Sequence, residues 1–181
     1  PVVSSAASDV YKRQKLFLSA FLVFSVPFSV GAQDDVVVTK QYDDGGMYEG
    51  TFKNGLQHGI GTYRLPNGYE YSGEWVDGEI LGVGVAKFPN GSVYEGNFIK
   101  GKPEGSGKII FADGGTYEGT WLDGKITGQG IAVYANGSRF EGGFLEAMHH
   151  GQGVMTNSDG YVYDGDWAVS YTHLTLPTKQ P

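Results

Sequence analysis

The stretch Tyr94-Glu95-Gly96-Asn97-Phe98 decides the fold class of this chain. Its pattern of aromatic, acid, glycine, any residue and aromatic recurs every 23 residues without insertion or deletion, starting at Tyr48, Tyr71, Tyr94, Tyr117, Phe140 and Tyr163. Self-similarity at a fixed period of this length is the signature of a repeat architecture. The sequence therefore predicts a stack of similar structural units.

Each unit has the composition of two strands separated by turns. In the second unit, Tyr71 to Val76 is strand-like, Asp77-Gly78 predicts a turn, and Gly82 to Phe88 predicts the return strand. Pro89-Asn90-Gly91 predicts the second turn, because Asn-Gly and Asp-Gly supply the positive φ angles of tight hairpins. No segment after the N-terminal apolar run has helical periodicity, so antiparallel strands are expected throughout.

Aromatic residues and glycines share one face of the first strand, because side chains alternate along a strand. A ring can lie over the bare backbone of a glycine, and burial of the rings offsets the entropy cost of so many glycines. The structural repeat signature comprises Tyr48, Gly50, Phe52, Tyr71, Gly73, Trp75, Tyr94, Gly96, Phe98, Tyr117, Gly119, Trp121, Phe140, Gly142, Phe144, Tyr163, Gly165 and Trp167. The third member alternates between Phe and Trp. This indicates either an aromatic groove that stacks a ligand or, as we favour, a pocket that any large ring fills.

The motif Tyr-Glu-Gly-x-Phe/Trp-x-x-Gly, followed by Gly-x-Gly, resembles the MORN (membrane occupation and recognition nexus) repeat. The resemblance covers five full units, Tyr48 to Val162, and the start of a sixth at Tyr163. It implies consecutive β-hairpins in an elongated, twisted, single-layer antiparallel sheet. The chain departs from the motif at Ser72, Phe140, Ala147 and Asp164.

The fifth unit carries the candidate functional residues. Ala147 replaces the turn glycine within Glu146-Ala147-Met148-His149-His150, so we expect a distorted turn there. Glu146, His149 and His150 form a weak candidate functional turn. Adjacent residues on a strand point to opposite faces, so the two histidine rings would not readily chelate one metal. A polar turn is the favoured interpretation.

A ladder of carboxylates recurs at one register, formed by Glu49, Glu95, Glu118, Glu141 and Asp164. Calcium prefers several oxygen ligands, but adjacent units lie two strand spacings apart, roughly 9–10 Å. Carboxylates at that separation do not share an ion. We therefore expect them to accept hydrogen bonds from turn backbone or to pair with lysine.

The motifs of common enzymes are absent from the sequence. There is no Gly-x-Ser-x-Gly, Walker-type or zinc-spaced motif and no cysteine nucleophile. The repeated Gly-x-Gly lacks the strand-loop-helix context of phosphate binding. We predict that this fragment is not an enzyme, with no catalytic, cofactor-binding or metal-binding residues.

Both ends of the chain look foreign to the repeats. Ser4 to Gln14 and Val169 to Thr178 are encodable by opposite strands of one DNA sequence, which resembles a transposase-type sequencing adapter. We therefore expect residues 1–14 and 169–181 to be artefactual flanks. The repeat domain then covers residues 48–168, preceded by a lead-in at 33–47 whose β-branched residues 36–39 predict a capping strand.

Residues 15–32 resemble a secretory signal peptide, with a helix as one option for their structure. Lys15 precedes an apolar run from Leu16 to Val30, and cleavage would leave Gln33 as the first residue. The run is short for a spanning helix, which needs about 20 apolar residues. We expect an exported protein, periplasmic or extracellular, with an uncleaved N-terminal membrane anchor as the alternative.

The charge balance restricts the classes of partner that we expect. Residues 33–168 hold 19 acidic and nine basic side chains, a formal charge of −10, with no basic cluster. Nucleic acid is therefore not an expected partner, and anionic membrane surfaces are disfavoured. The leading hypothesis is an exported, non-enzymatic repeat scaffold for protein–protein interaction or self-association. The alternatives are a membrane- or phospholipid-associated MORN module and the accessory repeat region of a larger enzyme.

Overall fold

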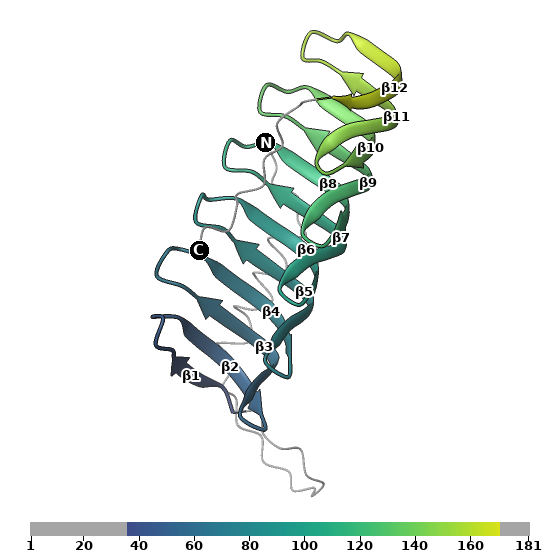
Figure 1. The fold of residues 1–181 in the computed structure, drawn as a ribbon. Coiled ribbons are helices and arrows are strands. Elements are labelled where there is room, and N and C mark those ends of the chain that lie inside the picture. The colour runs from purple at the N-terminus through teal and green to yellow at the C-terminus, as the bar shows by residue number, and fades with distance from the viewer. Residues whose placement is uncertain (1–35, 171–181) are drawn as a thin grey trace, which may run out of the picture. The chain divides into compact units, whose positions relative to one another are not determined.

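The computed structural model describes residues 36–170, which form one open antiparallel sheet without a helix. Its twelve strands follow chain order, so each strand pairs only with its neighbours in sequence (Figure 1). The expected all-β sheet of consecutive hairpins is confirmed. The predicted signal segment and the flank at residues 1–14 lie outside the described residues, as does the C-terminal flank beyond residue 170. The strands are Val38–Gln41 (β1), Met47–Lys53 (β2), Leu56–Arg64 (β3), Glu70–Val76 (β4), Glu79–Lys87 (β5), Val93–Ile99 (β6), Lys102–Ile110 (β7), Thr116–Leu122 (β8), Lys125–Val133 (β9), Arg139–Leu145 (β10), Met148–Thr156 (β11) and Val162–Ser170 (β12).

Each hairpin pairs a seven-residue strand with a nine-residue strand across a two-residue turn. Both turn residues have positive φ, the signature of a type I′ turn, whose twist matches that of the flanking strands. The five turns are Asn54-Gly55, Asp77-Gly78, Lys100-Gly101, Asp123-Gly124 and Glu146-Ala147. Because Val76 pairs directly with Glu79, the return strand begins three residues before the predicted Gly82.

The longer strand of each hairpin contains a β-bulge at its first Gly-x-Gly glycine. The register shifts between Gly73 and Trp75, and Gly82 opposite them has a φ of 97°. A residue with a side chain is strained in this left-handed region. One of the two paired glycines is therefore required by backbone conformation, and the other, Gly84, by the ring that covers it.

In the loops between hairpins, the side-chain oxygen of an Asn or Asp accepts a hydrogen bond from a backbone N–H. In the loop after β5, Phe88 N–H donates to Ser92 O over 2.8 Å and Gly91 N–H donates to Phe88 O over 2.9 Å. Asn90 Oδ1 accepts from Ser92 N–H over 3.0 Å. Only the glycine has positive φ here. The expectation that the Asn also adopts positive φ is wrong, because its side chain forms a local turn instead.

The lead-in pairs with the first repeat. β1 occupies Val38–Gln41, two residues later than the predicted strand at 36–39, and pairs antiparallel with β2. Beyond β1, the ring of Tyr42 lies 6.0 Å from that of Tyr63, and its hydroxyl accepts a hydrogen bond from Gln57 Nε2 over 2.6 Å. The lead-in therefore closes the first hairpin with an aromatic contact as well as a backbone ladder.

Candidate functional site

The signature aromatics form a buried layer on one face of the sheet, which we call the ring face. Tyr48, Tyr71, Tyr94, Tyr117 and Phe140 are fully buried. Each contacts the aromatic of its own strand and the aromatic of the next unit edge-on; Tyr94, for example, lies 5.1 Å from Phe98 and 4.9 Å from Trp121. Edge-to-face pairs at these separations are favourable beyond their burial.

The glycines beneath the rings leave no space for a side chain. A Cβ on Gly84 would lie 2.5 Å from Tyr71 Cε2, and a Cβ on Gly107 would lie 2.5 Å from Tyr94 Cε2. Each tyrosine hydroxyl also donates to a backbone carbonyl three residues on, as Tyr94 does to Asn97 O over 3.1 Å. Burial raises the pKa of the Tyr48 hydroxyl to about 12. These hydroxyls are structural donors rather than acids available for chemistry.

The alternating Phe and Trp rings are buried in the ring face, and each buried Trp adds one hydrogen bond. Trp75 and Trp121 are buried at 5% and 1% exposure. Their indole N–H groups donate to the carbonyls of Gly61 and Gly107 in the preceding hairpin, over 3.1 and 3.2 Å. Phe98 occupies the equivalent position between units and is equally buried. The rings pack against each other, so they do not offer a stacking surface for a ligand.

Three members of the carboxylate ladder pair with basic residues on the face of the sheet opposite the ring face, which we call the outer face. Glu49 Oε2 lies 3.6 Å from Arg64 Nη1, Glu118 Oε2 lies 3.4 Å from Lys108 Nζ, and Glu141 Oε2 lies 2.6 Å from Arg139 Nη2. Burial raises the pKa of Glu95, and nearby Lys108 opposes that rise. These exposed pairs stabilise a fold only weakly. Within residues 36–170, no three His, Asp or Glu side chains gather closely enough to hold a metal ion.

The fifth turn keeps the geometry of the other four, so the expected distortion is wrong. Glu146 and Ala147 have φ angles of 49° and 65°, and Leu145 pairs with Met148 as Ile99 pairs with Lys102. The Ala147 N–H donates to Ile126 O over 3.0 Å, as the equivalent Gly124 N–H donates to Pro103 O. Contacts with the preceding hairpin hold the turn even where its residue disfavours that conformation.

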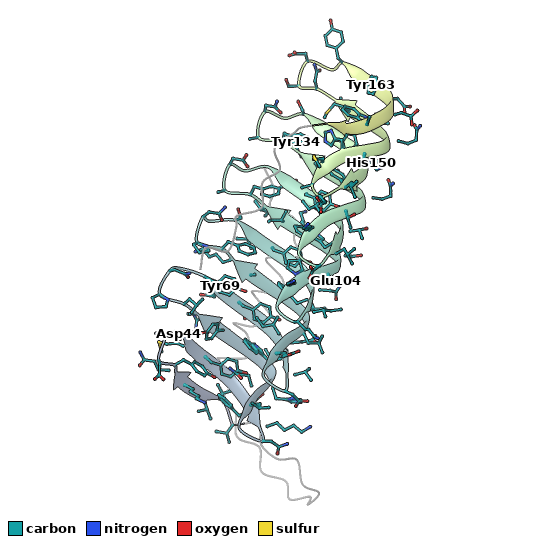
Figure 2. All side chains as sticks on the ribbon, viewed as in Figure 1. Asp44, Tyr69, Glu104, Tyr134, His150 and Tyr163 are labelled. Carbon is teal, nitrogen blue, oxygen red and sulfur yellow. The ribbon has the colours of Figure 1, made fainter. Side chains whose placement is uncertain are left out.

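The two candidate histidines lie on opposite faces, and His149 is not part of a polar turn. His149 is fully buried within β11 and stacks on Phe140 with ring centroids 3.7 Å apart. Its Nε2 shares a hydrogen bond of 2.5 Å with the hydroxyl of Tyr134, while its Nδ1 has no partner among the described residues. Burial lowers the pKa of His149 to about 4. His150, labelled with Tyr134 in Figure 2, is exposed.

Glu146, the third candidate, is tied to the preceding hairpin instead of to the histidines. Its carboxylate lies 2.6 Å from Lys125 Nζ, and this contact lowers the pKa of Glu146 and raises that of Lys125. The structure therefore does not bring Glu146, His149 and His150 together. Each one has a separate environment, and no shared site results.

An exposed apolar row on the outer face was not recognised in the sequence. Val76, Ile99, Leu122 and Leu145 are 38%, 49%, 59% and 42% exposed. Each follows the third signature residue of its unit, the Phe or Trp. The four therefore recur every 23 residues at one register, beside the type I′ turns. The sequence signal was available in that periodicity. We call these four residues the outer apolar row.

The architecture and its motif place the chain in a family. The family model for the MORN repeat matches residues 48–68, 71–93, 94–116, 117–139 and 140–160, more than half of the chain. The chain belongs to the MORN repeat family. The five repeats expected from the sequence are confirmed.

Among curated proteins, the chain is similar to alsin. It is 43% identical over 47 residues to alsin of Rattus norvegicus and, at the same identity and length, to alsin of Homo sapiens. These matches cover 23% of this chain and 3% of the alsin sequences. The likeness is therefore confined to about two repeats of a much longer protein.

One solved structure with a similar arrangement is the SAS-4 (dCPAP) TCP domain in complex with a proline-rich motif of Ana2 (dSTIL) of Drosophila melanogaster. The similarity has a TM-score of 0.39 at 13% identity, over 81% of this chain and 99% of that one. A similarity at this level does not indicate what the present chain binds. No helix among the described residues is long and apolar enough to cross a membrane.

Proposed function

We propose that this MORN repeat module is a non-enzymatic scaffold whose outer face binds another protein. The outer apolar row carries the proposal. The ring face buries its aromatics among themselves, whereas the outer row leaves four branched aliphatic side chains 38–59% exposed at one register. Single exposed apolar residues are ordinary on protein surfaces, but these four recur at one register of the sheet, which distinguishes the row from scattered exposure.

Substitutions on the outer face test this function. Leu122→Asp changes the row, and Val133→Asp changes an apolar side chain of β9 that is 37% exposed and lies outside the row. Affinity capture from the source cells, with proteins identified by mass spectrometry, should yield partners retained by wild type and Val133→Asp but lost by Leu122→Asp. Identical partner sets for all three proteins would contradict the proposal.

Self-association through strand edges is a second mode that the sheet supports. Within the described sheet, β1 and β12 each pair with one neighbour only. Unpaired edges can template pairing with another chain. Sedimentation across a concentration series should show a monomer–oligomer equilibrium, and a monomer at every concentration would exclude this mode.

Membrane association is the less favoured alternative. Residues 36–170 carry 17 acidic and nine basic side chains, a formal charge of −8, which opposes attraction to anionic headgroups. We expect no co-flotation with vesicles of phosphatidylserine and phosphatidylcholine. Flotation with the vesicles would favour the membrane alternative over protein binding.

Export remains part of the proposal. It rests on the basic residue, apolar run and small residues between Lys15 and Ala32. Expression of the native reading frame followed by N-terminal sequencing should give a mature protein that begins at Gln33. An intact leader in the cell-associated protein would instead support the anchored alternative.

A further inference from the structure

The spacing of the outer apolar row restricts the conformation of a partner. Equivalent residues of adjacent units are two strands apart, about 9–10 Å at ordinary strand spacing. The turns stay in contact at this end of the sheet: the Gly124 N–H donates to Pro103 O over 2.9 Å, and Lys102 Nζ lies 2.5 Å from Asp123 Oδ1 in the next turn. The row residues therefore stay two strand spacings apart where the row borders the turns.

Three regular conformations can be compared with that period. A polyproline II helix repeats every three residues and about 9.3 Å, so every third side chain faces the same way. An extended strand presents same-face side chains about 6.6–6.8 Å apart. An α-helix returns to nearly the same face after seven residues, about 10.5 Å, and falls out of register over several units. Only the polyproline II helix repeats its same-facing side chains at the spacing of the row residues.

The row is also narrow, which favours a thin ligand over a second folded surface. On the adjacent strands its neighbours are Glu79, Lys102, Lys125 and Met148, which pair directly with Val76, Ile99, Leu122 and Leu145. The four row side chains expose on the order of 300 Å², well below the roughly 800 Å² per partner of a standard protein interface. A stable dimer of this chain through the row alone is therefore disfavoured.

The charge of this face determines the charge expected of a partner. Lys102 and Lys125 are neutralised by Asp123 and Glu146 at 2.5 and 2.6 Å. Glu79, beside Val76, makes no ion pair within the described residues. Lys53, at the same register one unit before Val76, also makes no ion pair within the described residues, so the negative sign comes from the formal charge of −8 over residues 36–170 rather than from Glu79 alone.

We propose that the outer apolar row binds a basic, proline-rich segment in the polyproline II conformation, with an apolar side chain at every third position. The inference rests on the proposed protein-binding function of this face. Successive apolar residues of the segment would contact Val76, Ile99, Leu122 and Leu145. A lysine or arginine at one end would lie near Glu79.

The test uses the purified chain and two synthetic peptides of one composition. The probe is Lys-Lys-(Leu-Pro-Pro)₄, and the control peptide carries the same four leucines consecutively. Fluorescence anisotropy should show at least tenfold weaker binding of the control peptide. Leu122→Asp should weaken probe binding at least tenfold, Glu79→Gln about twofold to fivefold, and Val133→Asp less than twofold. Ile99→Ser is a milder second variant, and circular dichroism checks that each variant is folded.

The outcomes separate this inference from the proposed function. Equal binding of both peptides, no binding of the probe, or an unaffected Leu122→Asp variant would overturn the polyproline inference. If Leu122→Asp still loses captured partners in that case, the protein-binding function stands with a different ligand geometry. If neither experiment depends on Leu122, both proposals fail.

Discussion

The fourth and fifth repeats share one backbone but differ in their side chains. In the fourth, the Tyr117 hydroxyl donates to Thr120 O over 3.1 Å, and Thr120 Oγ1 donates to Gln129 O over 3.4 Å. In the fifth, Phe140 and Gly143 occupy the equivalent positions and can make neither bond. Both repeats nevertheless pair their strands in equivalent register and close with a type I′ turn.

The difference extends to the core. Ile126 of the fourth repeat is fully buried, and His149 stands at the equivalent position of the fifth, also fully buried. Tyr134, where earlier units have Phe88 or Phe111, supplies a hydroxyl to the His149 ring. The stacked neighbours therefore hold the hairpin shape, while individual side chains change in compensating groups.

The largest expected effect comes from filling the space beneath a ring. In Gly130→Ala the new Cβ would lie 2.5 Å from Tyr117 Cε2, and in Gly153→Ala it would lie 2.4 Å from Phe140 Cζ. Each should lower the free energy of unfolding by about 3 kcal/mol, because the ring or the backbone must shift. Gly101→Ala, with no atom within 4 Å and a φ of 74°, is the control for conformation alone, at about 1 kcal/mol. Urea denaturation measures all three. Equal losses at the three sites would contradict ring-over-glycine packing.

Acid should destabilise the fifth repeat through His149. Its folded pKa of about 4 lies below the ordinary value of 6.5, so the unfolded chain binds the proton more readily. Stability from this residue is complete above pH 6.5 and is lost as the pH falls toward 4, by about 2–3 kcal/mol.

The matched variant for that prediction is His149→Ile, which reproduces Ile126 of the fourth repeat. The difference in unfolding free energy between wild type and variant should grow in favour of the variant between pH 7 and pH 4.5. Subtracting one unfolding free energy from the other removes the contribution of the carboxylates that titrate in both proteins. A difference independent of pH would show that His149 accepts a proton without cost.

Restoring glycine to the fifth turn should stabilise the protein. Ala147 has a φ of 65°, a conformation that disfavours a Cβ, so Ala147→Gly should raise the free energy of unfolding by about 1 kcal/mol. The reverse change in the fourth repeat, Gly124→Ala, should lower it by about the same amount. Thermal unfolding of both variants checks the pair, and changes of the same sign would contradict the explanation.

The smallest expected effect concerns the tyrosine hydroxyl. Tyr117→Phe removes the hydrogen bond to Thr120 O and should cost about 1 kcal/mol. Phe140→Tyr introduces a donor directed at the equivalent carbonyl of Gly143 and should gain about 0.5 kcal/mol. Chemical denaturation resolves both changes. A loss on Phe140→Tyr would mean that the His149 ring leaves no room for the hydroxyl.

Local sequence predicted much of the fold and little of the candidate site. The 23-residue period, the Asp-Gly turn at residues 77–78 and the alternation of Tyr94, Gly96 and Phe98 depend on neighbours in sequence, so they could be read directly. The strand boundaries were less accurate, because the start of β5 depends on pairing across the turn. The environments of Ala147 and His149 were missed, because contacts with other hairpins decide them.

The sequence by itself determined the repeat, the all-β fold and the membership of the MORN repeat family, because each unit carries its own turns and its own rings. Only the tertiary structure decided that His149 is buried while His150 is exposed, and that Val76, Ile99, Leu122 and Leu145 form an exposed row. The physical reason is that a face of a strand becomes core or surface only when neighbouring hairpins pack against it.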